Sequence, residues 1–445
     1  MPLPSALLPL LRIFSSAFTR PTFQRWKVLL LATILTTGRH TLLNILRVAP
    51  ALTPGAPSTY HRIFSKRRWS AWRLARALAG YILGRWLPEG PVRAVVDDTV
   101  DEHRGKKVYG KGCHRDALRS THTHTHYRWG HKWIVLSLLI SFPFAPRPWA
   151  LPVRVALYRT QEQNRKEGRR HKTPVELARQ LLAVLAYWFP ERKFILSGDG
   201  GFSAHELAHY AQQSGAAYVG RFYPQANLYA PPPARRQRRG GRPRKKGRKL
   251  ASPQQVVARA RRKPLTVSWY GGGRRRVAVV TGTGQWYKGG VGLVEVRWVF
   301  VHDLTGTHRD EYFFSTDVGM RAKEIIEHFT GRWSIEVTFE EMRAYLGLET
   351  TRGWSEQTVL RLAPSLFGLY SVIALLYAGL PAKARKDGQI QWAGKDTVTF
   401  SDAITAVRRW LWREWVFARG QHKAAFSKLP RSLQATLLYA VAPAA

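Results

Sequence analysis

Acidic residues at three places in this 445-residue chain have surroundings that suggest chemistry. Asp97 and Asp98 follow a short β-branched run, and Asp199 follows a second apolar run and precedes two glycines. Glu336 lies in a helix-like stretch flanked by arginines. Carboxylates at the end of a buried strand are costly unless a positive group sits beside them, and a divalent cation is the commonest remedy. These residues therefore indicate a metal site, with a polar strand-end turn as the alternative for the paired aspartates.

The stretch from His328 to Glu349 predicts one amphipathic helix. At 3.6 residues per turn, spacings of three, four and seven place four residues on one stripe. These are Phe329, Arg332, Glu336 and Arg343. An apolar stripe on another side of the helix would seat it on a core. In isolation, Arg332 and Glu336 can also be interpreted as an ordinary exposed ion pair, which contributes a few tenths of a kcal/mol.

The order of the three carboxylates along the sequence is also informative. Asp97 and Asp199 end two apolar strands, and Glu336 follows on a helix. This is the layout of an acidic triad on an RNase H-like fold. Oxygen ligands of this kind hold two divalent ions roughly 4 Å apart, which activate a water or a 3′-hydroxyl and stabilise the leaving oxygen of a phosphodiester. Mg²⁺ suits such all-oxygen ligands, and we expect it as the cofactor, with Mn²⁺ able to substitute.

The charge balance indicates a polyanionic partner. Lys and Arg number 71 against 28 Asp and Glu, which gives a net charge of +43. Solubility requires far less, so nucleic acid is the leading candidate. The single cysteine, Cys113, excludes an intramolecular disulfide and a cysteine-based zinc site. It fits a reducing compartment, and we expect a cytoplasmic protein.

The N-terminal region, residues 1–90, predicts a basic helical DNA-binding domain. Its first 88 residues contain no Asp or Glu, and apolar residues recur at helical spacing. We expect Ser65 to cap a helix whose first turns carry Arg67 and Arg68 as phosphate contacts. The alternative is a solvated basic face.

Residues 91–222 predict the first part of an α/β catalytic core, with strands and helices in alternation. The first strand is expected to end at Asp97-Asp98-Thr99. Further strands are expected at 133–142, 151–158, 194–196 and 217–222, with helices at 173–188 and 203–213.

A composition change at residue 223 predicts a β-rich insertion over 223–320. Inside it, residues 231–249 form a basic loop that cannot pack a core. Gly241-Arg242-Pro243 resembles the core of an AT-hook, which lays arginine in an A·T minor groove. The alternative is a flexible basic loop. The loop residues expected to contact DNA are Arg242, Arg244, Lys245 and Lys246.

Residues 321–352 then supply the catalytic helix, and 353–445 predict a C-terminal helical region. There, two apolar helices are expected at 356–380 and 403–417, the first interrupted at Pro364. No apolar stretch is judged long enough for a membrane helix, the richest being 133–145, so we expect no membrane association.

Two further patterns are weaker. The run His122-Thr-His124-Thr-His126, with His114 and His131 nearby, can suggest a transition-metal site. Alternate residues of an exposed strand or loop also explain it, and no second ligand type has clear spacing, so we predict no metal there. Three tryptophans in the insertion, Trp269, Trp286 and Trp298, are expected to pack in the core, although one of them could instead hold a flipped base during hairpin formation, as an aromatic does in enzymes that this chain resembles.

The combined motifs resemble DDE transposases of the IS4-like group, and within it the IS701-like branch. That branch carries Tyr, Arg, Glu and Lys around the catalytic glutamate, where this chain has Phe329, Arg332, Glu336 and Arg343. The segments VVDDT and SGDGGF resemble the first and second acidic motifs, and GRPRKKG resembles a loop common in the branch. The likeness covers about 18–380.

This resemblance implies a bacterial DNA transposase with an RNase H-like core. Asp97, Asp199 and Glu336 would be its catalytic metal ligands, and Asp98 stays open as the first one. Arg332, Arg343 and Phe329 would contact DNA, although Phe329 lacks the hydroxyl of the family's tyrosine. The partners would be double-stranded transposon ends and target DNA, bound by a homodimer. The alternatives are a catalytically silent DNA-binding descendant and a structure-selective nuclease on the same fold.

Overall fold

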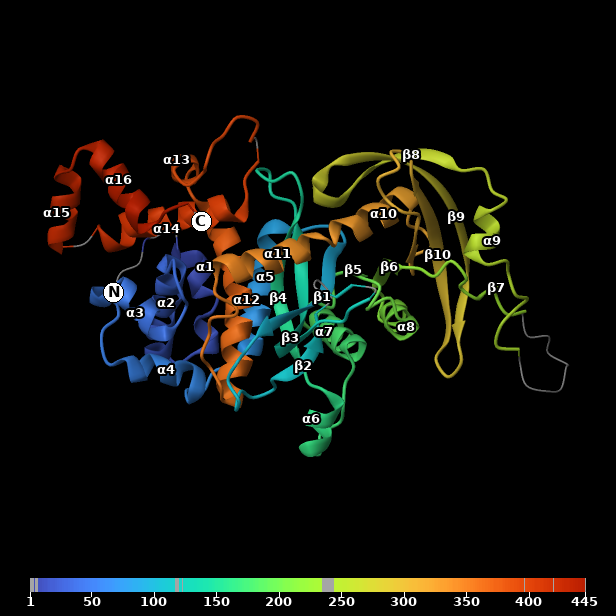
Figure 1. Cartoon of the computed structure of the whole chain (residues 1–445), viewed down its shortest axis with the longest axis horizontal. Helices are drawn as coiled ribbons and strands as arrows, with labels where there is room; N and C mark the ends of the chain where they lie inside the picture. Colours follow the sequence, from blue (N-terminus) through green and yellow to red (C-terminus); the bar gives the residue numbers. More distant parts are fainter. Residues whose placement is uncertain are drawn as a thin grey trace.

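A mixed sheet connects segments from residue 92 to residue 315 (Figure 1). The computed structural model describes residues 4, 7–116, 120–121, 123–233, 244–395, 397–418 and 420–444. Within these residues, eleven strands pair in one sheet. It combines β-branched and aromatic runs from both the expected core and the expected insertion.

In the half of the sheet formed by residues 92–221, the middle strand is β1, Val92–Glu102. It pairs antiparallel with β3 (Tyr127–Ile140) and parallel with β5 (Phe194–Gly198). Beyond these lie β4 (Trp149–Tyr158), antiparallel to β3, and β6 (Ala217–Arg221), parallel to β5. The order across this half is therefore β4-β3-β1-β5-β6. A short strand, β2, Gly112–Arg115, pairs with the first residues of β3.

The first strand corrects one expectation. It does not end at Asp97 but continues in register with β3 as far as Glu102. Side chains alternate between the faces of a strand, so Asp97 and Asp98 point in opposite directions. The carboxylates are tolerated inside the strand because cationic side chains from other elements meet them on both faces.

The strands of residues 223–320 extend the same sheet rather than forming a second one. The strand β11 (Glu311–Ser315) pairs antiparallel with β6 and continues the sheet outward. A long hairpin follows it, made of β9 (Arg274–Lys288) and β10 (Gly292–Asp303). Beside β9 lie β7, Leu228–Tyr229, and β8, Lys263–Ser268. The expected boundaries of this region stay predictions.

Tryptophans of the hairpin region pack as expected. Trp269 and Trp298 are buried, and Trp286 contacts Phe222 and Phe314. These tryptophans contribute apolar packing to the part of the sheet formed by residues 223–320.

Helices cover the sheet and connect its ends. The helix α7 (Pro174–Trp188) packs on β3 and β4, and a capping box at Thr173 fixes its start. The helix α8 (His205–Gln213) packs on α7 and β6. Two shorter helices in this part are α6, Gln161–Lys166, and α9, Pro253–Val257.

The N-terminal helices pack against C-terminal ones, and Figure 1 shows the blue and red ends of the chain on the same side of the molecule. The N-terminal set is α1 (Leu8–Arg12), α2 (Arg20–Leu35), α3 (Leu42–Val48), α4 (Pro57–Ser65) and α5 (Ala71–Trp86). Ser65 ends α4 instead of capping a helix, and Ser70 caps α5 by accepting from the Arg73 amide. This corrects the expected start of the basic helix.

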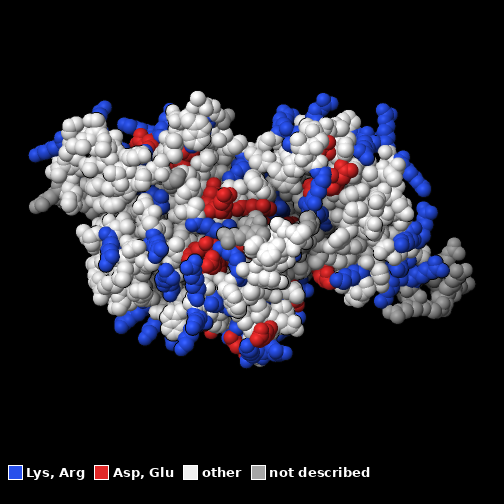
Figure 2. Space-filling view, viewed as in Figure 1, with Lys and Arg blue, Asp and Glu red and all other residues white. Residues whose placement is uncertain are grey.

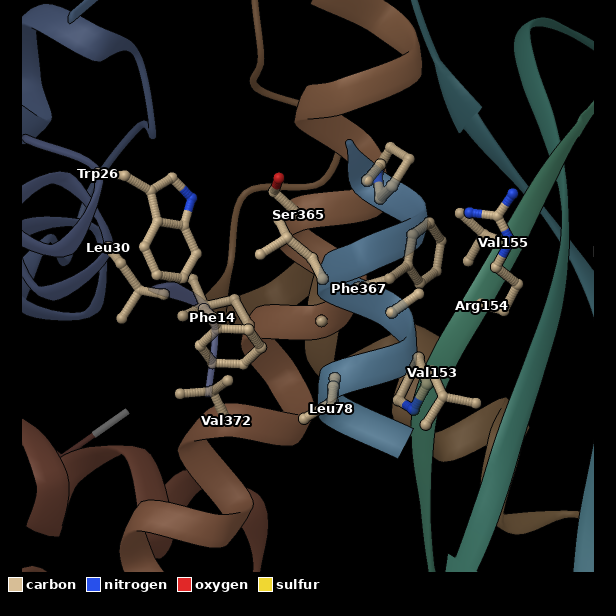
Figure 3. A pocket seen from close by; sticks show the side chains of 17 residues that line it. Phe14, Trp26, Leu30, Leu78, Val153, Arg154, Val155, Ser365, Phe367 and Val372 are labelled. Carbon is tan, nitrogen blue, oxygen red and sulfur yellow. The ribbon is translucent and has the colours of Figure 1, made fainter. Parts of the chain in front are cut away.

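The C-terminal set begins with the long helix α12, Glu356–Gly379, which Pro364 does not interrupt. Helix α12 packs on β4, α4 and α5, and a small apolar cavity of about 50 Å³ lies among α2, α5, α12 and β4 (Figure 3). The remaining helices are α13 (Ala382–Lys386), α14 (Phe400–Leu411), α15 (Gly420–Lys428) and α16 (Arg431–Val441).

Helix α12 also corrects the expected hydropathy profile. By length and composition it could cross a membrane, with a mean hydropathy of 1.8 in its most apolar window. However, 67% of that window is buried inside the protein. The contacts of α12 with β4 and α14 place much of this helix in the protein core.

Candidate active site

Asp97 lies on β1, and Asp199 directly follows the end of the neighbouring strand β5. The parallel pairing of β1 with β5 ends with Val96 opposite Gly198, so the two aspartates are the next residue on each chain. The Asp199 carboxylate accepts the amide hydrogens of Gly201 and Phe202 at 2.9 and 3.3 Å, which fixes its orientation. The sheet therefore brings together carboxylates that are 102 residues apart in the sequence.

Glu336 reaches the same place from a broken helix. The expected single helix is instead α10 (Ala322–Gly331) and α11 (Ser334–Tyr345). Between them the amide of Arg332 bonds the carbonyl of Phe329 at 3.2 Å, three residues back, which is the tighter 3₁₀ pattern. The side chains of Ser334 and Thr338 donate to backbone carbonyls of residues 148 and 150, and so seat α11 at β4.

Arg332 joins two of the carboxylates. Its Nη1 lies 2.7 Å from Oδ2 of Asp97, and its Nη2 lies 2.9 Å from Oε1 of Glu336. The side chains of Arg332 and Asp97 are 8% and 12% exposed, whereas that of Glu336 is 41% exposed. One guanidinium thus holds a buried and a partly solvated carboxylate in a fixed relation.

The pKa shifts of Asp97 and Arg332 indicate that the carboxylates would stabilise a further cation between them. Burial raises the pKa of Asp97, and the charges of Asp199 and Asp98 raise it further, while Arg332 opposes the shift. Burial lowers the pKa of Arg332, but the three surrounding carboxylates outweigh burial and leave its pKa above the ordinary value. One arginine therefore does not fully compensate the acidic groups. Their all-oxygen donor set fits Mg²⁺ or Mn²⁺.

The two adjacent aspartates have different surroundings. Asp98 Oδ2 lies 2.9 Å from Nζ of Lys132 on β3, on the face of β1 away from Arg332. Burial raises the pKa of Asp98, and Lys132 opposes that rise. Asp97 rather than Asp98 shares a face with Glu336.

Comparison with known families agrees with this acidic site. Residues 13–276 match the family described as the DDE superfamily endonuclease. The chain belongs to this family. No curated protein matches it. Endonucleases of this superfamily act on DNA with divalent metals. The matched part contains Asp97 and Asp199, and Glu336 lies beyond it.

Two residues expected to contact DNA are buried in this endonuclease. Phe329 is 1% exposed, and its ring stacks on Phe313 with centroids 4.2 Å apart. Arg332 is buried between its carboxylates. The predicted contacts of both residues with DNA stay predictions, and in this structure Phe329 packs in the core from within α10. Arg343 contacts the hydroxyl of Thr99, remains partly exposed, and stays a predicted phosphate contact.

The remaining predicted DNA contacts lie away from the carboxylates. Arg67 and Arg68 are exposed in the connection between α4 and α5. Arg244 and Lys245 are also exposed, and the ammonium of Lys246 lies over the rings of Tyr229 and Tyr287. Arg242, with the rest of the AT-hook-like segment, lies outside the described residues, as does His122.

The structure adds a group that the sequence analysis missed. Asp101, His103 and His131 each bring a possible ligand atom within 4.8 Å of the others. The pattern Asp-x-His, which begins at Asp101, two residues after Thr99, was the available signal. It was missed because the strand was expected to end before it. His124 and His126, from the histidine run, are exposed and belong to no such group among the described residues.

Proposed function

We propose that this endonuclease is a DNA transposase of the IS4-like group, IS701-like branch. It would bind the ends of its element, cleave DNA and join the 3′-hydroxyls to target DNA. The observation that carries the proposal is the bridge from Asp97 through Arg332 to Glu336, with Asp199 on the adjoining strand. The strand order β4-β3-β1-β5-β6, with the last two pairings parallel, supports an RNase H-like core.

Asp97, Asp199 and Glu336 would hold two Mg²⁺ ions, with Mn²⁺ able to substitute. When bound, such ions activate the attacking oxygen and stabilise the leaving oxygen of the phosphodiester. The protein's contribution is orientation. Backbone amides hold Asp199, and Arg332 holds Asp97 and Glu336 at a separation set by one guanidinium. Arg332 would thus act as a positioning residue.

The charge distribution supports a DNA substrate. Figure 2 shows Lys and Arg spread over this face, while acidic groups gather in small clusters, one of them near the position of α11. A polyanion would be held by the surrounding cations and kept in register over the acidic centre. The proposed contacts are Arg67, Arg68, Arg244, Lys245, Lys246 and Arg343, with Arg242 in a minor groove. Binding as a homodimer belongs to the same proposal.

The test uses DNA that carries the inverted repeats flanking the gene. Asp97→Asn, Asp199→Asn and Glu336→Gln should each abolish Mg²⁺-dependent end cleavage and strand transfer while leaving DNA binding intact in a mobility-shift assay. Asp98→Asn is the matched control and should retain cleavage. Full cleavage by any triad variant would refute that residue's role. Cleavage without strand transfer by the wild type would favour a structure-selective nuclease, and binding without cleavage would favour a silent descendant.

A further inference from the structure

A second polar cluster lies farther along β1 and is almost completely buried. Asp101 is 1% exposed, and His131, its partner on β3, is 2% exposed. His103 follows the end of β1, and its Nε2 lies 3.1 Å from Oδ2 of Asp101. The other carboxylate oxygen, Oδ1, accepts the backbone amide of His131 at 3.1 Å. Two imidazoles and one carboxylate therefore face one another largely shielded from bulk water, with only the His103 ring slightly exposed, at 8%.

The hydrogen bonding of His131 indicates that one of its two ring nitrogens carries no hydrogen. Its Nε2 lies 2.9 Å from the carbonyl oxygen of Tyr109, and a carbonyl can only accept, so Nε2 carries the hydrogen. In the neutral ring, Nδ1 is then a bare lone pair. That Nδ1 has no hydrogen-bond partner and lies 3.6 Å from Oδ1 of Asp101. Two acceptors face each other inside the protein, an arrangement that a cation between them would stabilise.

We propose that Asp101, His103 and His131 bind one Zn²⁺ ion at a site separate from the catalytic carboxylates. Two imidazoles with one carboxylate form a ligand set that zinc accepts and Mg²⁺ does not favour. Ligand atoms about 2.1 Å from a tetrahedral zinc lie roughly 3.4 Å from one another. In the cluster, His103 Nε2 lies 3.1 Å from Oδ2 of Asp101 and His131 Nδ1 lies 3.6 Å from Oδ1, and one ligand atom from each residue lies within 4.8 Å of the others. Three protein ligands leave the fourth position to water.

The surroundings of His131 match those of a metal ligand. A ligating histidine usually donates its other ring hydrogen to a carbonyl or carboxylate, which fixes the tautomer. The Tyr109 carbonyl has this role, and the Tyr109 amide donates to the carbonyl of Trp354 at 2.9 Å. The ion would connect β1 and β3 to the segment that holds Tyr109, and through it to the segment before α12. It would brace the strand that carries Asp97.

The site is distinct from two neighbouring features. Asp101 is four residues beyond Asp97, which corresponds to about 13 Å along a strand. His114 pairs opposite Arg128, and the strand alternation puts it on the face of β3 away from His131. His114 is therefore not a ligand in this proposal.

The test measures zinc binding rather than DNA cleavage. Untagged full-length protein is stripped with a chelator and titrated with Zn²⁺ against a chromophoric indicator, with excess Mg²⁺ to occupy the oxygen-only site. We expect about one Zn²⁺ per chain. Asp101→Asn and His131→Gln should lose more than the roughly 10–100-fold in affinity that removal of an outer-shell partner costs.

Two controls separate this site from other places. Asp97→Asn removes a catalytic carboxylate and should keep the zinc. His302→Gln removes the exposed His302–Asp310 pair, 2.7 Å apart, and should also keep it. If Asp97→Asn abolishes zinc binding, the ion belongs to the catalytic centre and the proposal is overturned.

The wild-type protein alone gives a second test, which does not depend on whether the variants fold. X-ray absorption at the zinc edge should report two imidazole ligands. An all-oxygen shell, or no zinc retained against the indicator, overturns the proposal. Neither result depends on whether the protein is a transposase, because no DNA enters the measurement.

Discussion

Arg332 and Asp97 are 235 residues apart in the sequence, yet their side chains form a buried ion pair 2.7 Å long. The same guanidinium reaches Glu336 at 2.9 Å, but this second carboxylate is 41% exposed. Water screens the exposed Arg332–Glu336 pair more than the buried Arg332–Asp97 pair. The two ion pairs should therefore contribute unequally to the free energy of unfolding.

A double-mutant cycle measures this inequality. Arg332→Ala, Asp97→Asn and Glu336→Gln are made singly and in pairs, and the free energy of unfolding is obtained from urea denaturation without metal, at a pH above the raised pKa of Asp97 so that this carboxyl is ionised. We expect a coupling energy above about 1 kcal/mol between Arg332 and Asp97, because removal of either leaves a buried polar partner. The coupling between Arg332 and Glu336 should be below about 1 kcal/mol. Equal coupling energies for the two pairs would contradict the assignment of Arg332–Asp97 as buried and Arg332–Glu336 as solvated.

Metal binding should release protons. Burial and the neighbouring carboxylates raise the pKa of Asp97, so without a divalent ion this group binds protons at a higher pH than a free aspartate does. A ligating carboxylate must lose its proton, so affinity for Mg²⁺ should increase as pH rises through the raised pKa. Titration with Mg²⁺ in weak buffer containing an indicator dye should show acidification.

Asp97→Asn tests the source of those protons. This variant should release fewer protons per bound ion than the wild type, and its Mg²⁺ affinity should depend less on pH. Lys323→Gln, at an exposed position on α10, is the control and should match the wild type. Undiminished proton release from Asp97→Asn would assign the titrating group elsewhere.

Glu341 on α11 should make stability fall with pH. Its side chain is 14% exposed, and burial raises its pKa to about 7, although the hydroxyl of Tyr370 donates to it at 2.6 Å. Between about pH 4.5 and 7 the native state keeps a proton that the unfolded chain has lost. The free energy of unfolding therefore decreases across that window and levels off above it, by about 3 kcal/mol in total.

Glu341→Gln isolates this contribution, because glutamine can still accept from Tyr370 and does not titrate. Relative to the wild type, the variant should become more stable as pH rises from 4.5 to 8, measured by urea denaturation at each pH. The adjacent Glu340→Gln is the control, since Glu340 is exposed. A difference between Glu341→Gln and wild type that stays constant with pH would refute the raised pKa.

The local sequence pattern predicted which strands and helices form better than it predicted where they end. The apolar runs before Asp97 and Asp199 were enough to predict two strands, and parallel pairing explains why their carboxyl ends meet. The continuation of β1 to Glu102 was not predictable locally, because aspartates disfavour strands. Its partners Lys132, His131 and Arg332 arrive from distant segments.

The helix around Glu336 shows the same limit. Gly331, where α10 ends, disfavours a helix interior, but the spacing of the residues on either side of it predicted an unbroken helix. The 3₁₀ turn arises from tertiary contacts instead, namely the stacking of Phe329 on Phe313 and the bonds of Ser334 and Thr338 to the backbone beside β4. The pairing of Arg332 with Glu336 was predictable, and its extension to Asp97 was not.

The salt dependence of DNA binding tests the N-terminal basic surface. Arg67 and Arg68 are exposed between α4 and α5, next to the buried Trp69, whose indole donates to the carbonyl of Ile63 at 2.6 Å. This anchor fixes the backbone that presents both arginines. Each phosphate contact contributes about 0.9 to the slope of log affinity against log salt concentration.

Arg67→Ala with Arg68→Ala should therefore reduce the magnitude of that slope by up to about 1.8, measured by fluorescence anisotropy on duplex DNA over a range of salt concentrations. The loss should be similar for end and random sequences, because phosphate contacts carry no base information. Arg321→Ala is the matched control, since this exposed arginine already pairs with Glu324 at 2.7 Å. An unchanged slope in the double variant would mean that both arginines lie on a solvated face, and DNA would then have to follow another basic surface to reach Asp97.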